Sequence, residues 1–334
     1  MKVAVMRQDP RLNRLVVDTL EKEGVPARLF DGRADMLAKD DAKLAAIQVL
    51  FAPGTMVVDD ALLARLPGLS GIVSPYIGIE GFDRAAATAR GIVIGNGQIP
   101  ESVESMAEGT VLMLLAAAYQ LPAATAAMAD GAWPTPLARG RLLRAMTVGI
   151  VGYGRIAQEV AIRLVPFGCR MLVHAPRLRA PLPQCAEAVA LPDLLAVSDA
   201  VVLLASLGPD SRHLINADMI ARIKPGAIVV NTARGGLIDE DALVAAAQAG
   251  RLGWLALDVF EQEPLPPDAP IRALPDAILT PHAIGHSVDT MQRLPLHALD
   301  SIRRVLRGDP PLSLVNPDAV PAWRARCAKP SARI

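Results

Sequence analysis

Three short segments in the second half of the chain carry side chains suited to anion binding and acid–base chemistry. Each follows an apolar run that predicts a strand, and the segments are residues 231–236, 258–266 and 280–285. They contain Arg234, Glu263 and His282. An arginine binds carboxylates as a permanent cation, and a histidine exchanges protons near neutral pH. Because ligands of open α/β sheets bind beyond the carboxyl ends of the strands, these three side chains could converge on one ligand.

Apolar runs alternate with helix-length stretches and supply the elements that position these segments. In the first hundred residues we expect strands at 2–6, 46–51, 72–74 and 92–94. Residues 13–23 predict an amphipathic helix that is closed by Gly24. Since helix-length segments separate the strands, we expect crossover connections and a parallel sheet.

A second α/β pattern begins after a long helix predicted at 101–121, whose first turns hold three carboxylates favoured by the helix dipole. A loop rich in glycine, proline and arginine is expected at 128–144. Strands are then expected at 147–151, 170–174, 200–204, 227–231, 254–258 and 277–280, and helices at 155–166, 239–249 and 291–307. Because the chain starts one α/β domain, inserts another and ends in a helix, we expect the first domain to be split.

The composition limits the class of protein. A chain of 334 residues exceeds the usual size of one core, so two domains are expected. Hydrophobic residues make up 52% and aromatic residues only 3%, a balance that fits buried parallel strands. The formal net charge of zero leaves no basic field to attract nucleic acid or an anionic membrane, so we expect neither as a partner.

The cysteines and one apolar stretch bear on location. Cys169, Cys185 and Cys327 lie far apart, without zinc spacing and without a disulfide framework, so a reducing, cytoplasmic setting and no metal are expected. Residues 110–129 carry no charge and are about as long as a membrane span. Because this stretch contains Pro122, we expect a buried helix of a soluble protein that ends near that proline.

A Gly-x-Gly-x-x-Ala motif follows a predicted strand and opens a predicted helix. Gly152 allows the tight turn, Gly154 lets the backbone approach a pyrophosphate, and Ala157 permits close packing of helix and strand. The helix start, with Arg155 and Ile156, offers free N–H groups to phosphates. This context predicts a dinucleotide site.

The end of the next predicted strand bears on which dinucleotide is preferred. In NAD-binding sites an acidic residue about 20 positions past the glycines holds the ribose 2′-OH. Here Ala175 lies at that place, no carboxylate is near it, and Arg177 and Arg179 follow. Arginines would form charge-assisted hydrogen bonds with a 2′-phosphate, so we predict that NADP(H) is preferred over NAD(H).

Several motifs together resemble the D-isomer-specific 2-hydroxyacid dehydrogenase family, in particular its glyoxylate/hydroxypyruvate reductases, over nearly the whole chain. The matching segments are residues 104–108, 145–152, 223–227, 231–235, 258–260, 263–264 and 280–282. The resemblance implies two Rossmann-like α/β domains, each a doubly wound parallel sheet, with the active site in the cleft. The cofactor domain, 99–288, would be inserted in a substrate-binding domain formed by 1–98 and 289–334.

The resemblance also implies the reaction, a hydride transfer between NAD(P)H and a small 2-keto acid that gives a D-2-hydroxy acid. Arg234, Glu263 and His282 match the family's catalytic trio. Arg234 would bind the substrate carboxylate or keto oxygen, and His282 would act as the acid in reduction and the base in oxidation. Glu263 would fix the imidazole tautomer.

Further contacts are implied by position within the matching motifs. Ile77 and Gly78 lie in a loop similar to the one whose N–H groups hold the substrate carboxylate. Cofactor contacts are implied for Ser206, which replaces a common proline, and for Ala233, Asp258 and Gly285.

Some features allow other interpretations. His286 invites a metal site but has no evident third ligand, and Trp133 could pack at a dimer interface or simply anchor the fold. The family implies a homodimer with the apolar region 101–129 near the interface. A phosphite dehydrogenase resembles this chain and keeps the trio, and a dinucleotide-sensing corepressor keeps many of the same residues. A formate dehydrogenase would carry glutamine in place of Glu263.

Overall fold

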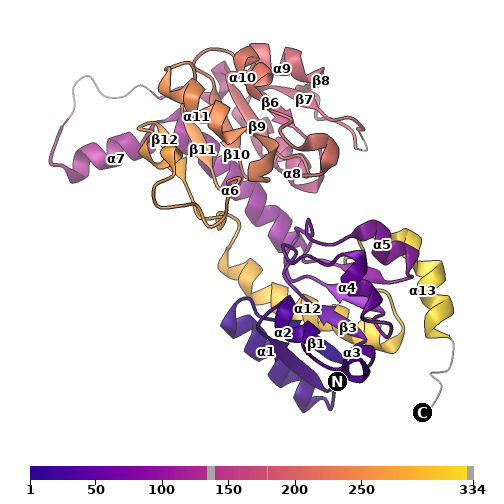
Figure 1. Ribbon diagram of the computed structural model, residues 1–334. Helices are drawn as coiled ribbons and strands as arrows, with labels where there is room; N and C mark the ends of the chain where they lie inside the picture. Colours follow the sequence, from indigo (N-terminus) through magenta and orange to yellow (C-terminus); the bar gives the residue numbers. More distant parts are fainter. Residues whose placement is uncertain (134–139, 179, 329–334) are drawn as a thin grey trace. The chain divides into compact units, whose positions relative to one another are not determined.

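The computed structural model describes residues 1–133, 140–178 and 180–328, which form two compact units (Figure 1). The first unit combines Met1–Ser102 with Val288–Ile334, and the second is Val103–Ser287. The expected divisions at 98/99 and 288/289 lie close to these boundaries. Each unit is built on one sheet of parallel strands only, which confirms the predicted α/β class.

The first unit has a five-stranded sheet with the order β2-β1-β3-β4-β5. Its strands are β1 (Val3–Met6), β2 (Ala27–Phe30), β3 (Val49–Phe51), β4 (Gly71–Val73) and β5 (Val93–Gly95). Its helices are α1 (Pro10–Lys22), α2 (Arg33–Leu37), α3 (Asp41–Ala45), α4 (Asp60–Ala64), α5 (Arg84–Ala89), α12 (Val288–Arg307) and α13 (Val320–Cys327). Helices α1, α12 and α13 pack on one face of the sheet, and α2 to α5 pack on the other.

The second unit has a seven-stranded sheet with the order β12-β11-β10-β9-β6-β7-β8. Its strands are β6 (Thr147–Val151), β7 (Arg170–His174), β8 (Ala186–Ala188), β9 (Ala200–Leu203), β10 (Ile228–Asn231), β11 (Leu255–Leu257) and β12 (Ala277–Leu279). Its helices are α6 (Pro100–Ala118), which begins just before the boundary, α7 (Leu121–Ala129), α8 (Arg155–Leu164), α9 (Leu191–Val197), α10 (Ala217–Arg222) and α11 (Glu240–Gln248). Helices α6 and α8 cover one face, and α9 to α11 cover the other.

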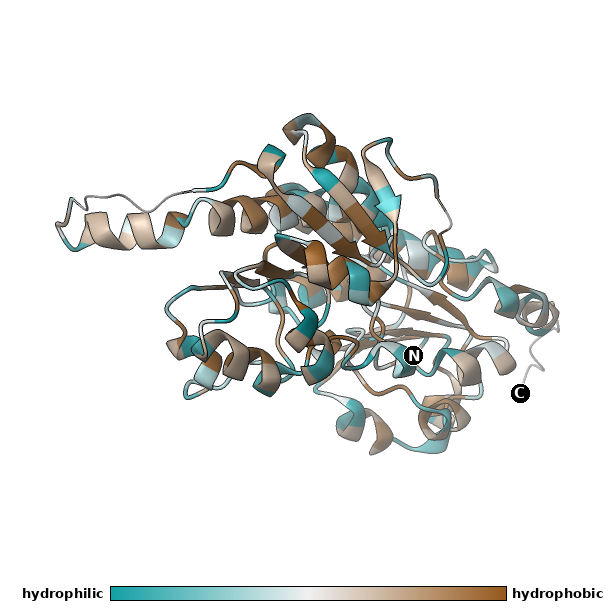
Figure 2. Cartoon of the chain, turned by 90° about the horizontal axis from the view of Figure 1, so that it is seen from above, coloured by the Kyte–Doolittle hydropathy of each residue, from teal (hydrophilic) through white to brown (hydrophobic). Residues whose placement is uncertain are grey.

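Strands that lie inside the sheets are continuous apolar runs because helices cover both of their faces. β1, β9 and β10 are buried at every position, and Figure 2 shows the hydrophobic colour along the strands. In the seven-stranded sheet the order reverses between β6 and β9, so the chain leaves β6 toward α8 on one face and leaves β9 toward α10 on the other, and the two connections open a crevice between them. A crevice of this kind is where α/β sheets bind ligands.

Two strands were not expected from the sequence, and both are edge strands. β2 contains the exposed Arg28 and Leu29, and β8 contains the exposed Glu187 and Ala188. An edge strand has a neighbour on one side only and tolerates polar residues, so it lacks the apolar signature of a central strand.

The apolar stretch 110–129 differs from the buried helix that we expected. Helix α6 ends at Ala118, Gln120 takes a left-handed conformation with φ 51°, and α7 starts in a new direction at Leu121. α7 has no buried residue and extends away from the sheet of its own unit (Figures 1 and 2). Within the described residues no single helix has the length and apolar composition to cross a membrane, although α6 and α7 together, bent by 65°, pass that test.

Candidate active site

The central feature of the second unit is a bonded imidazole–carboxylate pair. His282 Nδ1 lies 2.7 Å from Glu263 Oε2, and the other carboxylate oxygen of Glu263 accepts a 3.0 Å hydrogen bond from the N–H of Phe260. Burial acts to raise the pKa of Glu263, but hydrogen bonds from His282 and Phe260, with the nearby charge of Arg234, outweigh it and lower this pKa. The structure therefore places two of the predicted catalytic side chains, His282 and Arg234, near the carboxylate of the third, Glu263, which stays ionised at neutral pH.

A buried aspartate shapes the turn that presents His282. Asp258 follows β11 and is 1% exposed. Its Oδ1 accepts hydrogen bonds from Thr280 Oγ1 at 2.6 Å and from the N–H groups of Ala283 and Ile284 at 2.9 and 3.2 Å. The N–H of His282 donates to the Asp258 carbonyl, which supports the left-handed backbone of His282 at φ 53°. A left-handed non-glycine residue costs free energy, and here neighbouring bonds stabilise it.

The turn after β10 presents Arg234 through a second buried polar side chain. Asn231 Oδ1 accepts from the N–H of Ala233 at 3.1 Å, and Asn231 Nδ2 donates to the carbonyl of Arg234 at 2.9 Å. Gly235 must be glycine because a Cβ there would lie 1.9 Å from the carbonyl carbon of Phe260. The arginine-bearing turn is thus packed directly against the segment that leads to Glu263.

Helix α6 packs against the turn that carries Arg234 and against the segment that follows His282. The hydroxyls of Thr110 and Thr232 are 2.7 Å apart and buried, and Ser105 Oγ donates to the carbonyl of Gly285 at 3.0 Å. A Cβ on Gly285 would come within 2.0 Å of the Met106 sulfur. The predicted cofactor residue Gly285 is therefore buried against α6. Sequence reasoning missed these supporting hydroxyls, because spacing along a helix does not indicate which loop it will contact.

The glycine motif forms the tight turn between β6 and α8. Gly152 has φ 93°, and a Cβ on it would lie 2.5 Å from the N of Ala205 in the loop after β9. Gly154 directly precedes α8, and a Cβ added to it would have no atom within 4 Å. No side chain accepts a hydrogen bond from the N–H groups at the start of this helix. In the described structure no acceptor is present for the N–H groups of Arg155, Ile156 and Ala157. The residues present thus fit a dinucleotide pyrophosphate.

The other predicted cofactor residues lie around the same edge of the sheet. Ala175 follows β7 and is half-buried, and Arg177 is exposed two residues later. Arg179 lies outside the described residues. Ser206 is exposed in the loop after β9, where its carbonyl accepts a 2.8 Å hydrogen bond from Ser211 Oγ.

Ile77 and Gly78 belong to the first unit, in the loop that follows β4. Within the described residues no acceptor is present for the N–H groups of Ile77, Gly78 and Ile79. Gly54 lies so close to this loop that a Cβ on it would be 1.7 Å from the carbonyl oxygen of Gly78. Consecutive N–H groups without acceptors are typical of anion-binding backbone.

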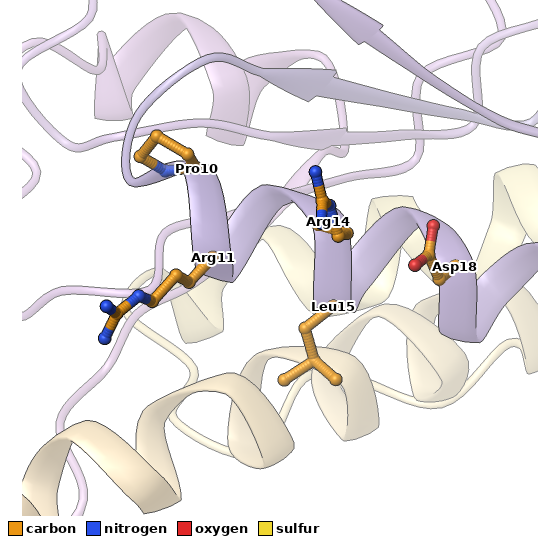
Figure 3. A pocket seen from close by; sticks show the side chains of 5 residues that line it. All are labelled: Pro10, Arg11, Arg14, Leu15 and Asp18. Atoms are coloured by element: carbon orange, nitrogen blue, oxygen red, sulfur yellow. The ribbon is translucent and has the colours of Figure 1, made fainter.

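A pocket on α1 and the side chain of His286 are two further features of the described residues. A shallow pocket of about 420 Å³ lies along α1, where Figure 3 shows Arg11, Arg14, Leu15 and Asp18 on the helix surface. None of its lining residues was predicted as a site residue. Burial and the charge of His282 lower the pKa of His286, and no group of three potential metal ligands is found in the described part of the chain.

Comparison with known proteins gives a consistent family. Residues 111–283 match the family model described as D-isomer specific 2-hydroxyacid dehydrogenase, NAD binding domain. The (S)-sulfolactate dehydrogenase of Chromohalobacter salexigens is 33% identical over 287 residues, which are 84% of this chain and 90% of that protein. The D-3-phosphoglycerate dehydrogenase of Methanocaldococcus jannaschii is 33% identical over 95% of this chain and 62% of its own length.

A solved structure supports the same relationship. The NADPH-dependent glyoxylate/hydroxypyruvate reductase of Sinorhizobium meliloti superimposes with a TM-score of 0.81 at 26% identity, covering 96% of this chain and 98% of that one. The chain spans only about half to three fifths of the length of the phosphoglycerate dehydrogenases that it matches. Taken with the bonded histidine and glutamate, the matched motifs lead to one conclusion: the chain belongs to the D-isomer-specific 2-hydroxyacid dehydrogenase family.

Proposed function

We propose that this chain is an NAD(P)-dependent oxidoreductase that interconverts a small 2-keto acid and the corresponding D-2-hydroxy acid. The observation that carries the proposal is the 2.7 Å bond between His282 and Glu263. A carboxylate bound to one ring nitrogen orients the imidazole and stabilises its protonated form, and this is the arrangement that a general acid needs.

In the proposed reduction, His282 gives a proton to the oxygen that becomes the hydroxyl. Its Nδ1 is bound to Glu263, so Nε2 is the ring nitrogen that would face the substrate. Glu263 remains ionised because hydrogen bonding outweighs burial and lowers its pKa, so it stabilises the imidazolium from which the proton leaves in reduction and which forms again in oxidation. Arg234 would bind the keto oxygen or carboxylate with its cationic fork.

We propose that the N–H groups of Ile77 and Gly78 bind the substrate carboxylate. Two observations support this proposal. Neither N–H group has an acceptor in the described structure, and the loop that carries them is tightly packed against Gly54. Two adjacent N–H donors suit one carboxylate, since hydrogen bonds to an ionised acceptor are stronger than bonds between neutral groups.

The proposed cofactor is a nicotinamide dinucleotide, with NADP(H) preferred. When bound, the nicotinamide supplies or accepts the hydride. Gly152, Gly154 and the start of α8 would hold the pyrophosphate, while Arg177 and Arg179 would bind the 2′-phosphate in the absence of a carboxylate near Ala175. Steady-state kinetics with NADPH and NADH test this preference, and a kcat/KM for NADH equal to or above that for NADPH would contradict it.

The substrate class is chosen from the chemistry and from the relatives. Relatives are named as acting on phosphoglycerate, sulfolactate and glyoxylate. We propose a small 2-keto acid such as glyoxylate or hydroxypyruvate. The test is a panel of 2-keto acids and phosphite with both cofactors, using wild type and His282→Ala. Keto-acid reduction that falls by orders of magnitude in H282A supports the proposal. Oxidation of phosphite alone, or nucleotide binding without turnover, would replace it with the phosphite dehydrogenase or corepressor alternative.

We also propose that two copies associate through α7 and that the protein resides in the reducing cytoplasm. α7 buries none of its residues within its own unit, and Leu121, Met128 and the nearby Trp133 are 50%, 56% and 78% exposed. Exposed apolar side chains gathered on one segment mark an interaction surface, and a second copy carries the same surface. Light scattering should give the mass of a dimer for the wild type, whereas Met128→Glu should shift the distribution to the monomer.

The three cysteines are free, which fits a reducing compartment, and cell fractionation tests this location.

A further inference from the structure

The loop that carries Ile77 and Gly78 is held from behind by the residues that follow β5. Asn96 Nδ2 donates a 2.7 Å hydrogen bond to the carbonyl of Ile77, and the N–H of Gly97 donates a 2.9 Å hydrogen bond to the carbonyl of Tyr76. Two successive carbonyls of the loop are therefore bound by two successive residues of the neighbouring segment.

These two bonds determine the direction of the two N–H groups proposed to bind substrate. The peptide groups 76–77 and 77–78 are trans, and a trans peptide is planar with its C=O and N–H pointing in opposite directions. The carbonyl of Tyr76 shares a plane with the N–H of Ile77, and the carbonyl of Ile77 shares a plane with the N–H of Gly78. Binding both carbonyls on one side therefore turns both N–H groups to the other side.

The bonding segment is itself rigidly anchored within the first unit. Asn96 is 8% exposed, its N–H donates to the carbonyl of Ser313, and its own carbonyl lies 3.1 Å from His297 Nε2 on α12. A Cβ on Gly97 would be 1.9 Å from the carbonyl oxygen of Pro75, so only glycine allows the two segments to lie this close. The donor on Asn96 thus has a fixed position relative to β5 and α12.

We propose that Asn96 is a positioning residue that holds the N–H groups of Ile77 and Gly78 ready for the substrate carboxylate. This inference rests on the proposed function and adds the residue that determines the geometry of its carboxylate site. Asn96 does not contact the substrate. It acts through the peptide plane, because an unrestrained loop would have to order these N–H groups at the moment of binding.

The test uses Asn96→Asp, which keeps the size of the side chain but replaces the N–H donor with an acceptor facing the Ile77 carbonyl. Asn316→Asp is the matched control. Asn316 is also buried, and its amide bonds the backbone of Ile94 in β5 and of Ile92 just before it, away from the proposed substrate loop. For N96D we expect KM for the keto acid to rise roughly tenfold, the effect of losing about one charge-assisted hydrogen bond, with kcat within about threefold. For N316D we expect a lower Tm and an unchanged KM.

Binding of oxalate, a carboxylate ligand that cannot be reduced, gives a readout that does not depend on turnover. Calorimetry should show the same loss of oxalate affinity in N96D, with NADPH affinity unchanged. Should N96D fail to fold, the neutral variant Asn96→Ser removes the same donor. An active wild type with an unchanged KM and oxalate affinity in the variant, or an equal rise of KM in N316D, would overturn this inference. A wild type that binds oxalate but reduces no keto acid would overturn the proposed reaction instead, while weaker oxalate binding in N96D would still support the role of Asn96.

Discussion

Replacing Glu263 with glutamine removes one negative charge from the proposed active site and little else. The carboxylate bonds His282 through one oxygen and the N–H of Phe260 through the other, and glutamine has nearly the same shape. A hydrogen bond to an ionised group contributes about 1.5–3 kcal/mol and a neutral one about 0.5–1.5 kcal/mol. The side chains of His282 and Glu263 are 45% and 34% exposed, and solvent screens their interaction. We therefore take the difference between the lower ends of the two ranges, and expect the substitution to weaken the His282 interaction by about 1 kcal/mol.

A loss of about 1 kcal/mol corresponds to a roughly fivefold fall in kcat/KM for keto-acid reduction at pH 7 and saturating NADPH. The matched control is Glu261→Gln, two residues earlier on the same loop, where the carboxylate contacts His213 and Arg212. E261Q should reduce keto acids at close to the wild-type rate. A value of kcat/KM for E263Q within twofold of the wild type, or an equal loss in E261Q, would refute the reasoning.

The pH dependence of the wild type provides a second check on the role of Glu263. Its pKa lies below the ordinary value of 4.5, because hydrogen bonds to the carboxylate outweigh burial. The stabilising charge is therefore fully present above pH 4.5 and is lost as pH falls through the lowered pKa. Wild-type kcat/KM should decline on that acidic side, whereas E263Q lacks the titrating group and should show no decline from this source.

Three further predictions concern the stability of the second unit and its candidate dinucleotide site. Burial raises the pKa of Asp199, but its hydrogen bonds to two cationic side chains and one backbone N–H lower it from 3.8 to about 2. D199N should therefore lose about 2 kcal/mol of unfolding free energy in urea at pH 7, with the difference shrinking as pH falls from 3.8 toward 2. Because a Cβ on Gly152 would lie 2.5 Å from the N of Ala205, G152A should weaken NADPH binding more than tenfold in a fluorescence titration, and wild-type affinity would count against the site. T110V leaves the buried hydroxyl of Thr232 without its 2.7 Å partner, which should cost about 1–2 kcal/mol and be visible as a lower Tm; an unchanged Tm would contradict the pairing.

The parts of the fold that could be predicted are those with a local signature. A central parallel strand such as β6 must be apolar along its whole length because both faces are covered, and its expected bounds, 147–151, agree with the structure. The turn at Gly152 was also predictable, since the positive φ and close approach required there admit only glycine. Composition and period along the chain carry this information without any contact between distant segments.

Other features depend on contacts between residues far apart in the sequence, and they become visible only in the folded chain. The edge strands β2 and β8 form because a neighbouring strand presents an open edge. Helix α6 ends at Ala118, before the proline at which we expected it to end, and Pro122 lies instead in the first turn of α7. The chemistry of the candidate site can be predicted from the residues alone, because the types of its side chains and the glycine turn are local properties. The bond of Glu263 to His282 and the bond of Asn96 to the loop after β4 follow from the order of the strands, which brings loops separated by many residues to the same edge of their sheet.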